Sequence, residues 1–359
     1  MTTGGRRLLA LVFAIALVGA AVGIRAVIDG GDSDEGSSPD GGGTPTLLCA
    51  TELEQVCQEL QRDHDIEVTV EPSGLSTDEI AKVPDDQIRD LGFDGWLTLS
   101  RDAEIARDRR ARGSLEPAIG EPTERIARSP LVIGIWKDRA AALSPECADQ
   151  QVTWKCIGDF AGRPWTTALV GQASWGAVKP GHSDPSTTAE GLLVIGQAAS
   201  SYFGRTDLSI DDYADDGFLE WFARLENNVR VRAVSPFEEM LVGGAALIDM
   251  VGTAEAEAGP ELARASRDRR DEVELLYPAP VATADVVYTP VEGAPGADEL
   301  QDLVTGDDGR AALARAGWRV DGEPHARGVP DTPRLPDRDN LPDAGSLQAL
   351  LETWREVTG

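Results

Sequence analysis

Strand-like runs pass directly into amphipathic helices at several points in this chain, and this alternation limits the possible folds most strongly. The run "TLLCA" (46–50) leads into "TELEQVCQELQRD" (51–63), whose apolar residues recur at helical spacing. The apolar segment 96–99 likewise precedes a helix that we expect to begin at about Asp102. Strand followed by helix, repeated along the chain, predicts an α/β fold with a mainly parallel sheet covered on both faces.

The second half of the chain continues this pattern. Polar and proline-rich stretches separate its apolar segments, as expected for loops between buried strands. Strands are predicted in "SPLVIGIWKD" (129–138), "SWGAVKPG" (174–181), "VRVRAV" (229–234), "AALIDMVG" (245–252) and twice within "VELLYPAPVATADVVYTPV" (273–291), and two helices in "GADELQDLVTGDDGRAALARAGWR" (296–319). A Pro-rich tail, residues 326–359, ends in the amphipathic run "SLQALLETWREV", which we expect to pack on the body of the protein, with partner binding as the alternative.

Four helix starts match the capping box, in which a hydroxyl and an acidic residue three positions later satisfy backbone N–H groups. The pairs are Thr51 with Glu54, Ser76 with Glu79, Thr187 with Glu190, and Ser235 with Glu238.

The N-terminus predicts export. Arg6 and Arg7 precede 17 uncharged residues, 8–24, which are just long enough to span a membrane. Residues 1–28 are therefore expected to form a transmembrane helix that acts as a signal anchor, with a cleaved and secreted form as the alternative. Residues 29–45, rich in Gly, Ser and Asp, are expected to be a flexible linker.

The four cysteines form two close pairs along the chain, Cys49 with Cys57 and Cys147 with Cys156. In an oxidising compartment an even number of cysteines favours disulfide bonds, and pairing within each couple is the connectivity we favour. Neither pair has C-x-x-C spacing and no histidine lies close to one in the sequence, so no metal site is expected.

The 359 residues include 33 basic and 62 acidic ones, giving a formal net charge of −29. Such a charge makes nucleic acids and anionic lipid surfaces poor partners. It is typical of a strongly solvated surface, with a saline or extracellular setting as another interpretation.

The segment "GHSDPSTTAEGLLVIG" (181–196) places Ser186, Thr187 and Thr188 directly before an apolar run. A helix N-terminus carries unpaired N–H groups and partial positive charge, so these hydroxyls can help to bind an anion or a carbonyl oxygen. The alternative is that they only cap a buried helix. Thr51, Ser100 and Ser235 also lie where a strand leads into a helix, so we expect these hydroxyls to converge on one cleft.

Together these segments resemble the extracellular solute-binding proteins of ABC transporters that have the type II periplasmic-binding-protein fold, close to the molybdate, sulfate and phosphate binders. The resemblance covers about residues 46–320 and is carried by the order of "LLCATELEQVCQEL", "WLTLSRDAEIA", "PLVIGIWK", "GHSDPSTTAEGLLVIG" and "YPAPVATADVVYTPV". It implies two α/β lobes within a domain of residues 46–325. Lobe I would comprise about 46–130 and 255–325, and lobe II about 131–254.

The resemblance also implies a small ligand held between the lobes, and transporter membrane subunits as partners. The implied ligand contacts are Thr51, Glu52, Ser100, Ser186, Thr187, Thr188, Ser235 and Thr253. Helix N-termini favour an oxyanion or a carboxylate, whereas the acidic Glu52 departs from the small hydroxylated residues usual in the family and leaves a cationic or neutral solute open. The N-terminal anchor departs from the usual lipid-modified cysteine, so a sensing role also remains open. No cofactor is implied.

Two other functions compete with solute binding. A scaffold or partner-binding module could use the same fold, with Trp96, Trp136 and Trp175 either lining a pocket or filling the core. A serine hydrolase is the weaker alternative. Gly181-x-Ser183-x-Pro185 nearly matches the nucleophile elbow, with His64 or His325 as a base, but it lacks the second glycine of that motif. We therefore expect a binding protein, not an enzyme.

Overall fold

The computed structural model describes residues 43–230, 232–331 and 333–359. The predicted signal anchor and most of the predicted linker lie outside these residues. Among the helices of the described part, none is long and apolar enough to cross a membrane.

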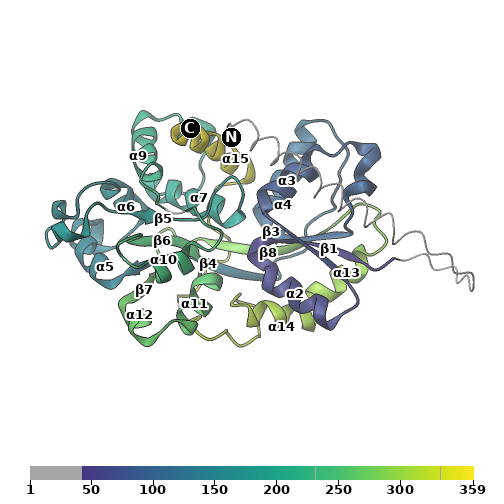
Figure 1. Ribbon diagram of the computed structural model, residues 1–359. Coiled ribbons are helices and arrows are strands. Elements are labelled where there is room, and N and C mark those ends of the chain that lie inside the picture. The colour runs from purple at the N-terminus through teal and green to yellow at the C-terminus, as the bar shows by residue number, and fades with distance from the viewer. Residues whose placement is uncertain (1–42, 231, 332) are drawn as a thin grey trace, which may run out of the picture. The chain divides into compact units, whose positions relative to one another are not determined.

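The described residues form a mixed sheet in the order β2-β1-β3-β8-β4-β6-β5, with β7 also paired to β4. The strands are β1 (Thr46–Ala50), β2 (Glu67–Glu71), β3 (Gly95–Leu99), β4 (Ala127–Trp136), β5 (Pro180–Gly181), β6 (Met250–Ala254), β7 (Val273–Leu276) and β8 (Thr283–Pro290). Helices cover both faces of the sheet in each of two lobes (Figure 1). The α/β class predicted from the sequence is therefore confirmed.

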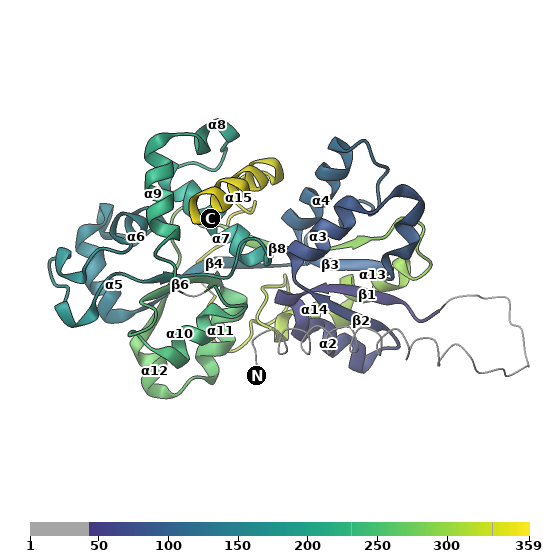
Figure 2. The same cartoon turned by 45° about the horizontal axis from the view of Figure 1, so that its top comes forward.

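The helices mostly follow strands, as the sequence predicts. They are α2 (Glu54–Asp63), α3 (Ser73–Lys82), α4 (Ser100–Arg112), α5 (Lys137–Leu143), α6 (Trp154–Phe160), α7 (Ala189–Phe203), α8 (Ile210–Tyr213), α9 (Asp216–Glu226), α10 (Pro236–Gly243), α11 (Glu255–Arg264), α12 (Arg267–Glu272), α13 (Ala297–Thr305), α14 (Asp307–Arg315) and α15 (Ala344–Thr358). Figure 2 shows α3 and α4 beside the first sheet half and α7, α9 and α15 beside the second.

The prediction of a mainly parallel sheet holds for β1, β2 and β3 of the first lobe and is wrong for the second lobe. Strand β1 pairs in parallel with β2 and β3, but β8 runs antiparallel to both β3 and β4. In the second lobe β6 and β7 are antiparallel to β4, and only the two-residue β5 is parallel to its neighbour β6. The reason is that β4 and β8 are long strands that cross between the lobes and return the chain in opposite directions (Figure 1).

The division of the chain into lobes remains a prediction, but strand pairing bears on one of its boundaries. Residues 255–276 were expected in lobe I. Strand β7 instead pairs with the β4 segment that also pairs with β6, and α11 packs against β4, β6 and α10.

The predicted strand around 174–181 is almost absent, since only Pro180 and Gly181 pair with a neighbouring strand. Three helix starts also differ from their predicted capping boxes. A 3-10 turn, Thr51–Leu53, precedes α2, and no side chain caps either element. Helix α3 begins three residues before Ser76, and Ser235 precedes α10 without a capping hydrogen bond.

The C-terminal tail packs on the body, as expected. Leu347 and Leu350 of α15 are fully buried, and the helix contacts α7, α8 and α9. Helix α15 also contacts α4 of the first lobe, where Arg112 donates a hydrogen bond to Gln348. The tail therefore links the two lobes.

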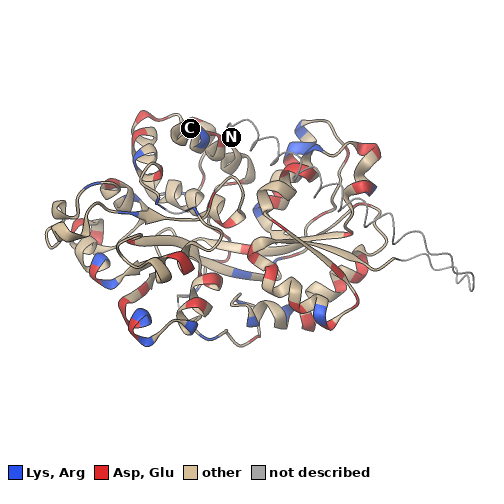
Figure 3. Cartoon of the chain, in the orientation of Figure 1, with Lys and Arg blue, Asp and Glu red and all other residues tan. Residues whose placement is uncertain are grey.

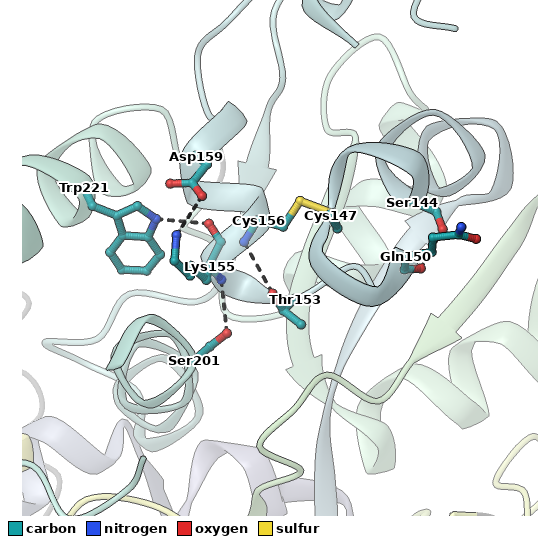
Figure 4. Close-up of a disulfide and its surroundings, with 9 residues drawn as sticks. All are labelled: Ser144, Cys147, Gln150, Thr153, Lys155, Cys156, Asp159, Ser201 and Trp221. Atoms are coloured by element: carbon teal, nitrogen blue, oxygen red, sulfur yellow. Dashed lines mark hydrogen bonds and ion pairs between the residues drawn. A yellow bond between two sulfur atoms is a disulfide. The ribbon is translucent and has the colours of Figure 1, made fainter. Parts of the chain in front are cut away.

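Both disulfide bonds form within the predicted pairs, Cys49 with Cys57 and Cys147 with Cys156. Figure 4 shows the second bond at the start of α6, where the hydroxyl of Thr153 accepts a hydrogen bond from the backbone N–H of Cys156. Trp221 of α9 donates to the carbonyl of Lys155 at 3.1 Å, so the disulfide-linked segment is joined to the neighbouring helix.

Replacing Cys147 and Cys156 together by Ala should lower the free energy of unfolding by about 2–3 kcal/mol, because a crosslink over 9 residues no longer restricts the unfolded chain. Denaturant unfolding of the variant and of the wild-type protein, with and without reductant, measures this loss. Equal stability of both proteins under oxidising conditions would contradict the expectation.

Candidate functional site

The two lobes meet at the N-terminus of α7. Glu52, in the turn after β1, extends its side chain across the gap, and its Oε1 accepts a hydrogen bond of 3.1 Å from the backbone N–H of Glu190. Its other oxygen accepts a hydrogen bond of 3.2 Å from the hydroxyl of Ser73 at the start of α3. One carboxylate therefore joins helix starts from both lobes.

The backbones of the lobes also touch beside this carboxylate. The N–H of Gly74 donates a hydrogen bond of 3.0 Å to the carbonyl of Thr187. A Cβ at Gly74 would lie only 2.4 Å from the carbonyl oxygen of Ser186, so any larger residue would push the lobes apart. The absence of a side chain at Gly74 thus permits this close approach.

A cavity of roughly 290 Å³ lies next to the Glu52 carboxylate, at the ends of strands β1, β3 and β6. Open α/β folds bind ligands at such strand ends. The lining residues are Thr51, Glu52, Glu54, Gln55, Gln58, Leu99, Ser183, Thr188, Glu190, Val234, Ser235, Ala254, Ala256, Glu257, Pro260, Glu261, Arg264, Ala284, Ala316 and Trp318.

The charge of this lining is strongly negative. Five glutamates line the cavity, and Arg264 is the one basic residue in the described lining. Arg264 already forms an ion pair with Glu261. Figure 3 shows Asp and Glu on helices of both lobes, consistent with the acidic composition. Apart from Glu261, the acidic groups that a solute meets in the cavity form no ion pair with a basic residue of the described chain.

Two of these glutamates share one hydroxyl. The Oγ1 of Thr253 lies 2.6 Å from an oxygen of Glu257 and 3.2 Å from an oxygen of Glu190. A threonine hydroxyl has a single proton, so it can donate to only one carboxylate. A proton on one of the two carboxyl groups would let that group donate to Thr253 at the second contact. The arrangement therefore favours a protonated glutamate beside an ionised one.

The pKa values of the pair shift in the direction that this geometry favours. Burial, together with the negative charge of Glu52, raises the pKa of Glu190 to about 7, against hydrogen bonds from the Ala254 N–H, Ser183 and Thr253. Burial and the charge of Glu190 raise the pKa of Glu257 well above its usual range. Glu257 is thus the better candidate for the protonated partner.

A third buried acid, Asp102, lies near Glu52. Burial raises the pKa of Asp102, in the first turn of α4, to about 8, and the nearby charge of Glu52 acts in the same direction. Hydrogen bonds from Thr98 and Ser73 oppose this shift. Ser73 therefore contacts both Glu52 and Asp102, so that here too one hydroxyl lies between two carboxyl groups.

The structure brings part of the predicted ligand-contact set to this cavity. Thr51, Glu52, Thr188 and Ser235 line it. Thr253 is buried directly behind Glu190 and Glu257. Their contact with a ligand remains a prediction.

The other predicted contacts lie elsewhere. Ser186 lines a second cavity of roughly 290 Å³, between α3, α4 and α15, together with Thr188. Neither cavity is lined by Ser100 or Thr187. Ser100 is the first residue of α4, two residues before the predicted helix start at about Asp102.

The hydroxyls before α7 mainly serve the local turn. Ser186 donates to the side chain of Asp184, and Thr188 donates to the Asp184 carbonyl. Thr188, rather than Thr187, caps the helix by accepting from the N–H of Gly191. Glu190 does not return to complete a capping box. Its carboxylate instead accepts the Ala254 N–H of the neighbouring strand at 2.9 Å.

Sequence reasoning missed the carboxyl groups Glu190, Glu257 and Asp102, and Trp318 in the cavity wall. Glu190 was assigned to a capping box, so its hydrogen bond with the Ala254 N–H of β6 was not predicted. A weak signal existed for Glu257, because it follows Thr253 by four residues at the point where β6 leads into α11. An acidic residue in the first turn is common in helices and by itself indicates no site.

The hydrolase alternative finds no support in the geometry. The hydroxyl of Ser183 donates to Glu190 at 3.2 Å. His64 and His325 pair instead with Asp308 and Asp331. Helix α7 begins six residues after Ser183, so this serine does not lie in the tight strand-to-helix turn that a nucleophile elbow requires.

The structure describes the positions of the three tryptophans that the sequence left between a pocket and the core. Trp96 and Trp136 are buried in hydrophobic clusters, and Trp175 packs edge-on against Trp165. Trp96 and Trp136 therefore fill the core, whereas Trp175 is only partly buried against it. The described part of the chain contains no group of three or more His, Cys, Asp or Glu residues arranged to hold a metal ion.

Asp102→Asn should remove part of the pH dependence of stability. Between about pH 4 and 8 the folded protein keeps the Asp102 proton that the unfolded chain loses, so unfolding becomes easier as the pH rises. The variant should match the wild-type protein at pH 4 and exceed it at pH 8, with a slope difference of up to about 1.4 kcal/mol per pH unit.

Denaturant unfolding at several pH values measures this difference. Asp108→Asn, an exposed change on the same helix, is the control and should leave the slope unchanged. Parallel pH profiles of wild-type protein and Asp102→Asn would show that Asp102 is ionised in the folded state.

No model of a known protein family and no curated protein sequence matches the chain. Solved structures do match. The chain is similar to the periplasmic binding protein AfuA of Actinobacillus pleuropneumoniae, with exogenous fructose-6-phosphate bound (TM-score 0.57, 11% identity, 87% of this chain and 97% of that one). It is also similar to a periplasmic thiamin binding protein (0.55, 12%, 92% and 100%) and to iron-bound HitA of Pseudomonas aeruginosa (0.55, 14%, 88% and 99%).

These neighbours are binding proteins rather than enzymes, and each is covered over nearly its whole length. The similarity confirms the resemblance inferred from the sequence at the level of the fold. Residues 43–359, as far as the structure describes them, have the two-lobed type II periplasmic-binding-protein fold.

Proposed function

We propose that this chain is an extracytoplasmic solute-binding protein that holds a small ligand in the cavity beside Glu52. The fold supports a binding role, and the cavity has residues from both lobes in its wall, namely Thr51 and Leu99 from one lobe and Ser183 and Ala254 from the other. A volume of roughly 290 Å³ suits a small metabolite. Because the ligand would touch both lobes, its binding would stabilise their contact.

The ligand that the cavity suits best carries a positive charge. The observation that carries this proposal is the group of Glu52, Glu190 and Glu257 in the cavity wall, with Arg264 already paired. An oxyanion or carboxylate, the class favoured by the helix starts alone, would be repelled by these groups. An organic cation such as a protonated amine would instead supply the positive charge that these carboxyl groups lack.

Cation binding should also release protons. The hydroxyl of Thr253 lies between two carboxyl groups, and the raised pKa values of both favour a proton on one of them when no cation is near. A bound ammonium group favours the ionised form of both. The affinity for a cation should therefore rise with pH through about 7, where Glu190 loses its proton.

The proposed cellular role combines the N-terminal sequence pattern with the fold. We propose that the N-terminal segment holds the domain at the outer face of the membrane, where it delivers its ligand to an ABC transporter or serves as a sensor. The structural neighbours include a protein with fructose-6-phosphate bound, a thiamin binding protein and an iron-bound protein, so the fold alone does not determine the ligand class. The alternative is a scaffold on the same fold, without a solute.

A thermal-shift screen of the full-length protein at pH 8 tests this function. Putrescine, spermidine and agmatine should include at least one compound that raises Tm, since binding to the folded state adds about 2.7 kcal/mol at a hundredfold excess over Kd. Sulfate, phosphate and molybdate should give no specific shift. Unchanged melting with every cation would favour the scaffold alternative.

Glu257→Gln should weaken binding of the responding cation by about 10- to 100-fold, because a charged hydrogen-bond partner contributes about 1.5–3 kcal/mol. It should also reduce the number of protons released, which calorimetry in buffers of different ionisation enthalpy measures. Glu239→Gln removes a charge from an exposed position of α10 outside the cavity and is the matched control. An equal loss of affinity in both variants would mean that only the overall charge matters.

A further inference from the structure

We propose that Glu52 acts as a built-in anionic ligand: its carboxylate occupies the position between the lobes that an anionic solute would take, and so excludes anions from the cleft. This inference rests on the proposed solute-binding function. It identifies the residue that determines the sign of the charge that the site accepts.

The donors around Glu52 are those that an anion would use. Oε1 accepts from the N–H of Glu190, in the first turn of the 15-residue helix α7, and Oε2 accepts from the hydroxyl of Ser73. A backbone N–H at a helix start and a hydroxyl are typical donors to bound anions, since they stabilise negative charge without a full positive charge. The carboxylate therefore uses the donors that a sulfate or a ligand carboxylate would need.

Glu52 also lacks the basic ion-pair partner that a buried structural carboxylate usually has. Within the described residues no ion pair with Lys, Arg or His involves Glu52, although it lies between buried groups of both lobes. Its charge is instead held by N–H and O–H donors and acts on the acids nearby, since it raises the pKa of both Asp102 and Glu190. This is the environment of a bound anion rather than of a salt bridge.

Helix capping alone does not explain this contact. Thr188 already caps α7 from the adjacent position, whereas Glu52 lies 138 residues before Glu190 in the sequence and in the other lobe. Close approach of the lobes at Gly74 and Thr187 leaves little room for a second anion at the same donors. An anionic solute would have to displace the carboxylate and then face Asp102 and Glu190.

The test is to remove the carboxylate from the Glu190 N–H and the Ser73 hydroxyl. Glu52→Ser does this and places a small hydroxylated residue at position 52. The full-length variant should gain a rise in Tm of at least about 3 °C with sulfate or molybdate at pH 6, where Asp102 is protonated. Sulfate stabilises most proteins weakly by exclusion from their surfaces, so the shift is measured against Glu239→Ser. The wild-type protein should match that control.

Glu52→Gln separates occupancy from charge. The amide retains an acceptor for the Glu190 N–H and fills the same space, so this variant should stay unresponsive to sulfate and molybdate. It should also lower the pKa of Asp102, followed by carboxyl NMR titration, because a neighbouring negative charge is lost. This second readout remains informative if Glu52→Ser does not fold.

Three results would overturn the proposal. They are a Glu52→Ser variant with no greater anion response than its control, a Glu52→Gln variant that responds as strongly as Glu52→Ser, and an unchanged Asp102 pKa in Glu52→Gln. A wild-type protein that no cation stabilises would instead count against the proposed function, and the anion response of Glu52→Ser would still be measurable.

Discussion

The contact of Glu52 with the N-terminus of α7 is the interaction on which the rest of the site depends. It joins the turn after β1 to a helix of the other lobe, with Ser73 as a second donor from the start of α3. Gly74 permits the close approach, and α15 adds a further link through α4. The geometry of the cavity follows, since its wall consists of residues from both lobes.

Burying so many acids near one another has an energetic cost. Protonation and hydrogen bonds from hydroxyl groups, rather than ion pairs with basic residues, offset this cost. Ser73 lies between Glu52 and Asp102, and Thr253 lies between Glu190 and Glu257. Raised pKa values at Asp102, Glu190 and Glu257 are the expected result. A ligand cation would replace these protons, which connects the charge of the site to its proposed specificity.

Local patterns were sufficient to predict the α/β class, the order of most elements, the disulfide pairs and the packing of the tail. They failed where a residue's partner is distant in the sequence. Strand direction was wrong in the second lobe because β4 pairs antiparallel with β6 and β7, which lie far from it in the sequence. Glu190 was misassigned because its partners are Glu52 and Ala254. Glu52 was recognised as unusual for the family, but only the folded chain shows that its carboxylate occupies the helix start.

A crystal structure of the full-length protein grown from ammonium sulfate would test the central claim most directly. We predict that the Glu52 carboxylate lies within hydrogen-bonding distance of the Glu190 N–H and the Ser73 hydroxyl, with no sulfate at the N-terminus of α7. A sulfate ion bound to the Glu190 N–H, with the Glu52 side chain turned away, would contradict it.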